Sequence, residues 1–450
     1  MRAIGTNGAV AATLAAFALA ALRAQAPAGE PFQQLTGGHR LRVVAVAGCT
    51  AQAVAVVWPH AAATTAQAAD AAADTVAEPL ARAHLVAALR AQQSGAVLPK
   101  GAMRSVEVGE ACTVFTAVWP DAQPEGAAAW FGALLRAPDP VAQQDQLARA
   151  CAQQALAADD ADWLFPGDVL LGRARRALAV GGGVHGSPTY LQRLSPADCA
   201  IAVTEPPCAP LCVCVVGSDL GVPALAAALE RVSPRGDAVR AVAASSTPRP
   251  PAGPDIVTHP RVDAAYVAVV ARAPAPGPDA LPFALGVAVL RSRASVRFRD
   301  YRGNEAMART PFVTCEVLLG EPTVMLCRRG RSPEPAQPRA ELEALLAELG
   351  QQPPDDREVG LAADALLAEW AVPPWSRAQV ATFVEAPASL LPRARTLALL
   401  LHHGIGDDAV RGLGALTGAA VARQLAATLA PERLWWGGLV PAARPPVLGR

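Results

Sequence analysis

Short apolar runs alternate with longer amphipathic stretches along the chain, which is typical of a protein that mixes strands and helices. Strands are predicted where valine-rich runs lie between turn residues, at 41–47, 53–58, 105–118, 211–216, 264–271, 312–319, 323–327 and 434–440. Helices are predicted at 66–90, 126–135, 140–158, 168–180, 222–232, 279–290, 339–349, 357–370, 376–384, 394–402 and 409–429. Ser195-Pro196 predicts one more short helix, with the serine as N-cap and Asp198 in its first turn.

The order of these elements repeats, which predicts an α+β fold in two halves. A stretch rich in Pro, Gly, Ser and Arg separates the halves and is predicted to be a linker over 233–262. We therefore expect a first domain over 37–232 and a second over 263–445, each a mostly antiparallel sheet packed with helices.

The first 26 residues have the features of a signal peptide. Arg2 gives a positive start, residues 9–22 are almost purely apolar, and Ala24-Gln25-Ala26 has the small-x-small pattern that signal peptidase recognises. The apolar stretch is shorter than the ~20 residues of a membrane span, and no later segment is long and apolar enough. We expect a periplasmic or secreted protein whose mature chain begins near Pro27 and contains no membrane span.

Charge and cysteine content narrow the function classes. The 39 basic residues balance 39 acidic ones, which excludes the broad basic field of a dedicated nucleic-acid binder. Nine cysteines are too few for a disulfide scaffold. Cys208, Cys212 and Cys214 are expected to be core residues rather than metal ligands, because LCVCVVG is typical of a buried strand. Cys315 and Cys327 are equidistant from a turn at Glu321, so we expect them to face each other across a hairpin.

Two short motifs are weak indicators of a site. Gly181, Gly183 and Gly186 match G-x-G-x-x-G, but no strand precedes them, so no dinucleotide site is predicted. His402 and His403 are interpreted as cationic side chains at a helix C-terminus with Gly404 as cap, although nearby aspartates would allow a metal.

Several segments in series resemble the insulinase/pitrilysin family of zinc metallopeptidases, which includes the mitochondrial processing peptidases. The segments are LRVVAVAG, AVAVVWP, LPKGAMRSVEVGEACTVFTAVWP, a Gly186-x-Pro188 followed by LQRLSPAD, LCVCVVGSD and RDYRGNEAMART. The resemblance covers nearly the whole chain. It implies two homologous α+β halves that face each other across a chamber, as in a clamshell.

The family's chemistry requires H-x-x-E-H on a helix, with two zinc ligands and a glutamate as general base, and a further glutamate ligand on a later helix. Aligned on this resemblance, the segment AHLVAAL retains His84 but has Ala87 in place of the base and Ala88 in place of the second histidine. Gln153 or Gln154 stands where the distal glutamate belongs. The resemblance therefore implies a degenerate site with no zinc, although intact relatives bind it, and no catalytic residue.

The resemblance also places Arg302 where the family has a substrate-binding arginine. The tyrosine of that motif has no counterpart, because Arg309 and Thr310 stand at its interval and Tyr301 precedes the arginine.

The leading hypothesis is a catalytically inactive, peptidase-like protein, exported and acting as a non-catalytic subunit or peptide-binding partner of a zinc metallopeptidase. Its partners would be a zinc-bearing homologous subunit and a peptide or unfolded polypeptide, with no nucleic acid. One alternative is an active zinc metalloendopeptidase in which His60 or His185 joins His84 as relocated ligands. The other is a structural scaffold protein that keeps only the fold.

Overall fold

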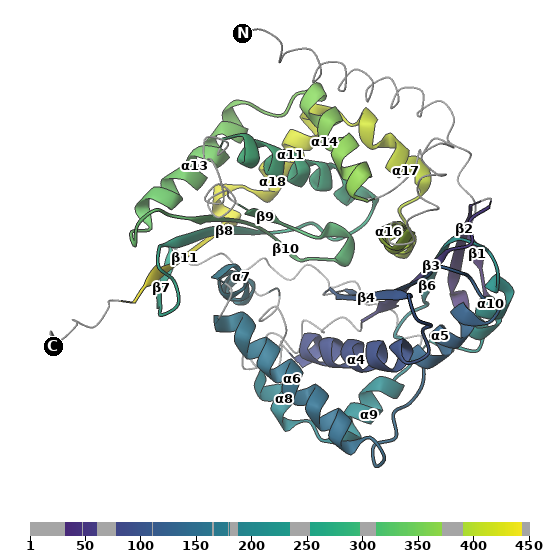
Figure 1. Cartoon of the computed structure of the whole chain (residues 1–450). Helices are drawn as coiled ribbons and strands as arrows, with labels where there is room; N and C mark the ends of the chain where they lie inside the picture. The colour runs from purple at the N-terminus through teal and green to yellow at the C-terminus, as the bar shows by residue number, and fades with distance from the viewer. Residues whose placement is uncertain are drawn as a thin grey trace, which may run out of the picture.

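The computed structural model describes residues 32–46, 48–60, 78–109, 111–163, 166–178, 180, 188–234, 253–297, 312–370 and 390–442. The predicted signal peptide, most of the predicted linker and the helix predicted at 376–384 lie outside these residues. Figure 1 shows the described part as two groups of strands and helices, with residues 32–234 in one and 253–442 mainly in the other.

The first half contains six strands and seven helices among the described residues. Its strands are β1 (Gln33–Gln34), β2 (Arg40–Ala45), β3 (Gln52–Pro59), β4 (Met103–Val108), β5 (Cys112–Trp119) and β6 (Cys212–Gly217). Its helices are α4 (Glu78–Gly95), α5 (Gly126–Leu134), α6 (Gln144–Trp163), α7 (Pro166–Ala177), α8 (Pro188–Arg193), α9 (Pro196–Thr204) and α10 (Val222–Glu230).

The second half has strands and helices in a similar order. Its strands are β7 (Asp255–His259), β8 (Tyr266–Arg272), β9 (Phe312–Thr314), β10 (Thr323–Arg329) and β11 (Trp435–Pro441). Its helices are α11 (Leu281–Arg297), α13 (Ala336–Gln351), α14 (Asp356–Glu369), α16 (Leu390–His402), α17 (Asp407–Arg411) and α18 (Gly418–Thr428).

The two sheets have the same topology once the two-residue β1 is set aside. The first sheet runs β2-β6-β3-β5-β4 and the second runs β7-β11-β8-β10-β9, so each places its strands in the order first, fifth, second, fourth, third. In both, the first and fifth strands pair in parallel and every other neighbouring pair is antiparallel. The predicted α+β class and the repeated, mostly antiparallel sheets are therefore confirmed.

Each sheet is covered on one face by helices of its own half. In the first half Val54 and Val56 of β3 pack with Trp130 of α5 and Leu225 of α10. In the second half the corresponding face lies against α11 and α13, and α14 packs on α11. Since both faces of β3 are buried, its sequence is an unbroken apolar run instead of an alternating one.

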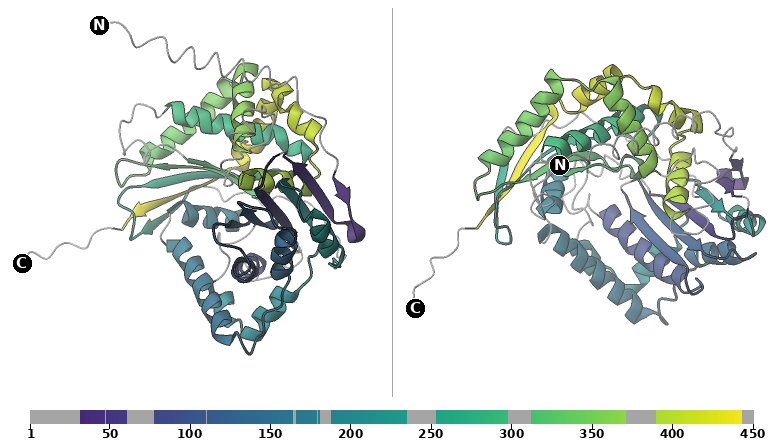
Figure 2. Two further views of the ribbon diagram at one scale, coloured as in Figure 1. Left: turned by 45° about the vertical axis from the view of Figure 1, so that its right-hand side comes forward. Right: turned by 45° about the horizontal axis from the view of Figure 1, so that its top comes forward.

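The other face of each sheet is covered by a helix of the opposite half. Helix α16 of the second half lies across β3, β6 and β5, where Ala53 and Ala55 leave room for the helix to approach closely. Helix α7 of the first half lies across β11, β8 and β10, with Leu170 and Ala174 in one cluster with Val270. Figures 1 and 2 show both helices between the two groups of strands. Each half thus supplies one helix to the sheet of the other half, so the exchange is reciprocal.

A third core is made of helices alone. Helices α4, α6, α8 and α9 enclose a cluster that includes Leu85, Leu147, Cys151, Leu191 and Cys199. The predicted N-cap of α9 is confirmed, because the Ser195 hydroxyl accepts from the Asp198 backbone and the Asp198 carboxylate accepts from the Ser195 backbone. No described helix is both long enough and apolar enough to cross a membrane.

Some predicted elements differ from the observed ones, and one observed strand was not predicted. The single strand expected at 105–118 is a hairpin of β4 and β5, and the single helix expected at 409–429 is broken into α17, a 3-10 turn and α18. Thr417 starts the last of these by accepting a hydrogen bond from Ala420. Strand β7 lies within the predicted linker. Its sequence DIVTH has only two apolar residues and it occupies a partly exposed edge of the sheet, so the apolar pattern did not predict a strand there.

The expected facing of Cys315 and Cys327 is wrong. The register of β9 and β10 places Cys327 opposite Phe312, while Cys315 follows the end of β9. Cys315 points into the core shared with α11, and Cys327 lies on the opposite face under α7. A 3-10 turn over residues 317–319 replaces the regular hairpin that the prediction assumed.

Candidate functional site

The candidate site is built on α4, the helix that follows β3 and carries the degenerate motif. Helix α4 lies between the first sheet and the helical cluster, so it has two buried sides. Leu85 and Leu89 face the helical cluster, and Ala87 faces the sheet. The high apolar content of this segment therefore serves two packing surfaces at once.

The motif positions occupy one turn of α4. His84 and Ala88 are half-buried, while Ala87 is only 3% exposed and belongs to the cluster that contains Trp58 and Phe115. Gln153 is exposed on α6, which packs beside α4. The position of the general base in the related motif is thus filled by a methyl group inside an apolar core.

These residues do not fit a zinc ion. A catalytic zinc requires three protein ligands and an open position, but alanine has no donor atom and a neutral glutamine is a poor ligand. His84 is the only imidazole of the three motif positions on α4. Within the described part of the chain no three His, Cys, Asp or Glu side chains are grouped closely enough to hold a metal.

Of the proposed substitute ligands, His60 belongs to no such group within the described part of the chain. The Nε2 atom of His60 lies 2.7 Å from Oγ1 of Thr113 at the end of β3. His185, the glycines of the G-x-G-x-x-G match and Arg302 lie outside the described residues.

A buried arginine fixes the C-terminal part of α4. The Arg90 guanidinium carbon lies 3.4 Å from the centre of the Trp58 ring, and its Nη2 donates to the backbone oxygens of Val203 (2.7 Å) and Glu205 (3.2 Å). Burial lowers the pKa of Arg90 to about 9, against the opposing effect of the Glu205 carboxylate. Arg90 therefore links the motif helix to both the sheet and the end of α9, a role that the sequence analysis did not identify.

The edge of the first sheet lies next to this helix. Strand β4 is the last strand in the sheet order and contacts α4, to which the Arg104 side chain donates a hydrogen bond at the Ala91 carbonyl. Glu107 of β4 pairs with Arg395 of α16, with Nη2–Oε2 at 2.7 Å. One side of β4 is thus held by the second half, and no described strand lies along its outer edge.

His402 and His403 lie at the end of α16, where Gly404 adopts a left-handed φ of 67° as the predicted cap requires. Their expected positive charge is wrong. Burial lowers the pKa of His402 to about 3, and the nearby His403, Arg40 and His60 lower it further. The Arg40 guanidinium instead donates to the Leu401 carbonyl at 2.9 Å, so an arginine from the first half satisfies the helix end.

Cys212 and Cys214 of β6, and Cys208 in the loop before it, are core residues. Cys208, Cys212 and Cys214 are all buried, and burial raises the pKa of Cys212 to about 11. A protonated thiol in an apolar strand is a poor metal ligand because the thiolate is the binding form.

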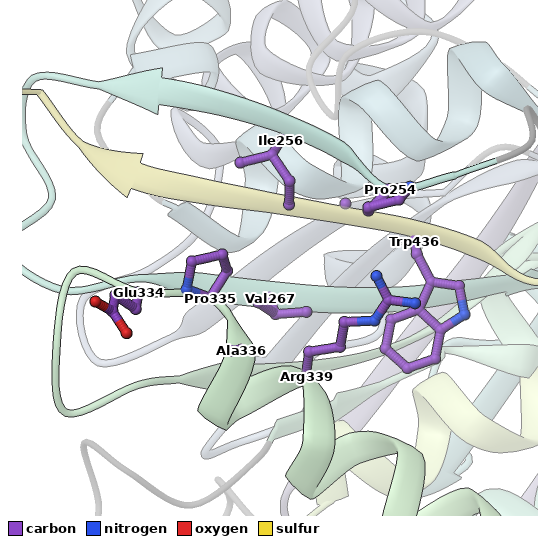
Figure 3. A pocket seen from close by; sticks show the side chains of 9 residues that line it. Pro254, Ile256, Val267, Glu334, Pro335, Ala336, Arg339 and Trp436 are labelled. Carbon is purple, nitrogen blue, oxygen red and sulfur yellow. The ribbon is translucent and has the colours of Figure 1, made fainter.

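A pocket of about 410 Å³ lies in the second half, away from α4. Its lining, shown in Figure 3, consists of Pro254, Ile256, Val267, Glu334, Pro335, Ala336, Arg339, Trp436 and Gly437. The Arg339 guanidinium lies 5.4 Å from the centre of the Trp436 ring. The lining contains no histidine, cysteine or hydroxyl-bearing side chain.

Comparison with models of protein families and with curated protein sequences finds no match. Comparison with solved structures does. The peptidase M16 inactive domain from Pseudomonas fluorescens is similar with a TM-score of 0.62 at 15% identity, covering 92% of this chain and 98% of that one. A protease from Helicobacter pylori is similar with a TM-score of 0.63 at 13% identity, covering 91% and 99%.

The periplasmic protease PqqL from Escherichia coli gives a comparison of length. Its first half is similar with a TM-score of 0.54 at 12% identity, covering 92% of both chains. Against the whole of PqqL, the match covers 93% of this chain and 48% of the protease. The chain therefore has the fold of one M16 peptidase unit, the fold that the insulinase/pitrilysin resemblance implied.

Proposed function

We propose that this chain is a non-catalytic member of the M16 peptidase family that acts as the partner of a zinc-bearing relative. The observation that carries the proposal is the combination of the M16 fold with Ala87 and Ala88 on α4, where Ala87 is sealed in the apolar core. A chain that has both sheets but only one imidazole at the motif positions of α4 can still bind, though α4 cannot hold a zinc that activates water.

The length comparison supports a pairing. This chain matches 48% of PqqL, so the length of that protease accommodates two units of this size. We propose that a zinc-bearing relative supplies the second unit of the pair. A structure of a peptidase M16 inactive domain from Pseudomonas fluorescens has been solved, which supports the existence of non-catalytic M16 units in nature.

The bound segment would be an extended peptide that adds to β4. This strand is at the end of its sheet, adjacent to α4, and its main-chain groups can pair with an added strand. The ion pair between Glu107 and Arg395 holds β4 in place from the opposite face. We therefore expect affinity for unfolded polypeptides with little sequence preference, because main-chain hydrogen bonds dominate such binding.

We propose a periplasmic or secreted location, supported by the features of residues 1–26 and by the name of the periplasmic protease PqqL. N-terminal sequencing of the native protein is expected to start near Pro27. Recovery of a chain that still begins at Met1 or Arg2 contradicts this location.

The direct test of function is affinity purification of the native chain from its source, followed by mass spectrometry. We expect a co-purifying M16-type protein with an intact H-x-x-E-H motif, present in a fixed ratio. Adding reduced, carboxymethylated casein to the isolated chain tests peptide binding separately. A chain that purifies alone and does not bind this polypeptide contradicts the proposal and supports the scaffold alternative. Zinc-dependent cleavage by the chain alone supports the metalloendopeptidase alternative.

A further inference from the structure

Two cysteines of the helical cluster have their sulfur atoms in contact. Cys151 of α6 and Cys199 of α9 place their Sγ atoms 2.9 Å apart, which is closer than the ordinary contact of two non-bonded sulfurs. Cys151 is 7% exposed and Cys199 is completely buried. The two residues are 48 positions apart in sequence, so the contact results from the packing of α6 on α9.

Both helices hold their cysteines firmly at this distance. Cys199 is in the first turn of α9, where its N–H donates to the Ser195 carbonyl at 3.1 Å and the Ser195–Asp198 capping box fixes the helix start. Cys151 lies within the 20-residue α6, between the buried Leu147 and Ala155. Only a small approach of the two sulfur atoms is needed to reach the S–S bond length of about 2.05 Å.

We propose that Cys151 and Cys199 form a disulfide bond when the chain folds in an oxidising compartment. The proposal is independent of the partner role and of peptide binding. The sequence pattern did not identify this pair, because Cys151 and Cys199 are distant in sequence and do not form a recognisable cysteine motif.

The reaction is a thiol–disulfide exchange with a donor disulfide, either oxidised glutathione or a protein oxidant. The Cys151 thiolate attacks one donor sulfur, so a mixed disulfide forms and the other donor sulfur leaves as a thiolate. The Cys199 thiolate then attacks the Cys151 sulfur of the mixed disulfide and releases the second donor thiolate. Two protein thiols are oxidised, one donor disulfide is reduced to two thiols, and the two protons pass to the released thiolates.

Cys151 is the less buried of the two residues, and the products are the same if Cys199 attacks first. Because both sulfurs are buried in the folded chain, the exchange takes place before the helical cluster has closed.

The bond would join the helices that enclose α4. Helices α6 and α9 both contact α4, and the loop they close contains α7, which covers the second sheet. A bond here restricts the unfolded chain and stabilises the cluster behind the motif helix.

The test uses the full wild-type chain, folded in a buffer of oxidised and reduced glutathione, then denatured and alkylated without a reductant. We expect peptide mapping to recover one linked pair that contains Cys151 and Cys199. Alkylation of both residues, or a bond from either one to another cysteine, overturns the proposal.

Matched variants test the consequence for stability. A reductant is expected to lower the thermal midpoint of the wild type and of C315A/C327A, whose cysteines are equally buried but lie on opposite sheet faces. It is expected to leave C151A/C199A unchanged. If C151A/C199A does not fold, the peptide map of the wild type alone tests whether the disulfide forms.

Discussion

Arg42 and Asp407 form a two-pronged ion pair between the halves, with Nη1–Oδ1 and Nη2–Oδ2 distances of 2.7 Å each. Arg42 is on β2 and Asp407 begins α17, so the pair links the first sheet to the segment that follows α16. The side chains are 13% and 22% exposed, which shields the pair from solvent more than an ordinary surface contact. A parallel arrangement of this kind is stronger than a single hydrogen bond because both guanidinium nitrogens are matched.

Replacing Arg42 with alanine is therefore expected to destabilise the chain by about 1–2 kcal/mol. The reason is that Asp407 keeps a partly buried charge without its main partner. Chemical denaturation of the wild type, R42A, D407A and the double variant measures the coupling between the two residues. R411A is the control, since the Arg411–Asp408 pair is exposed and its loss should cost less than about 0.5 kcal/mol. Equal effects of R42A and R411A contradict the importance of the interface pair.

Placing a carboxylate at the former base position is expected to be costly. Ala87→Glu buries a charge in the cluster with Trp58 and Phe115, so we expect a loss of about 3 kcal/mol or more in unfolding free energy. Ala88→Glu is the matched control, because it adds the same residue to the same helix at a half-exposed position. A loss at position 87 no larger than at position 88 would show that this site has room for a carboxylate.

The isolated chain is expected to bind no stoichiometric zinc and to cleave no peptide in a chelator-sensitive manner. The reason is the donor set of α4, which offers one imidazole where three ligands are needed. Elemental analysis of the purified chain measures this directly, with His84→Ala and His60→Ala as variants. About one zinc per chain that is lost in His84→Ala contradicts the prediction, and its loss in His60→Ala as well supports the relocated ligands.

Stability is expected to fall on mild acidification because of His402. Its pKa is lowered to about 3 in the fold, compared with about 6.5 in the unfolded chain, so below pH 6.5 the unfolded state binds a proton that the folded state excludes. Between pH 7.5 and 5.5 this difference removes up to about 1.4 kcal/mol of unfolding free energy. Burial also lowers the pKa of His403, which acts in the same direction.

Urea denaturation at pH 7.5, 6.5 and 5.5 measures this dependence, and His402→Asn removes the titrating group. The variant is expected to lose less stability than the wild type over the same range. A variant with an unchanged pH dependence shows that other groups are responsible for it.

The sequence predicted the fold class and most elements because their local signals agree with their surroundings. Strands β3 and β6 are apolar on both faces, and α9 has its capping box in the sequence itself. Local sequence signals failed to predict elements that depend on tertiary contacts. Strand β7 is held by β11, a strand that lies far along the chain, and the break before α18 depends on Thr417 as a cap.

The candidate site, too, could be predicted from the sequence only in part. The substitutions at Ala87 and Ala88 were visible in the sequence, but the sealing of Ala87 in the core requires the packing of α4 on the sheet. Arg90 and the Cys151–Cys199 contact were missed because each depends on α9, which is more than 100 residues from Arg90 and 48 residues from Cys151. The neutral state of His402 likewise follows from burial, which a helix-end rule does not include.

The reciprocal placement of α7 and α16 has a consequence for biosynthesis. A ribosome completes β6 at Gly217 well before it reaches Leu390, so the alanine-lined face of the first sheet has no cover during this interval. An uncovered apolar sheet face is prone to aggregation, and holding chaperones bind such surfaces. Proteolysis within the segment between the halves after folding should leave them associated, whereas the first half synthesised alone should need such a chaperone to remain in solution.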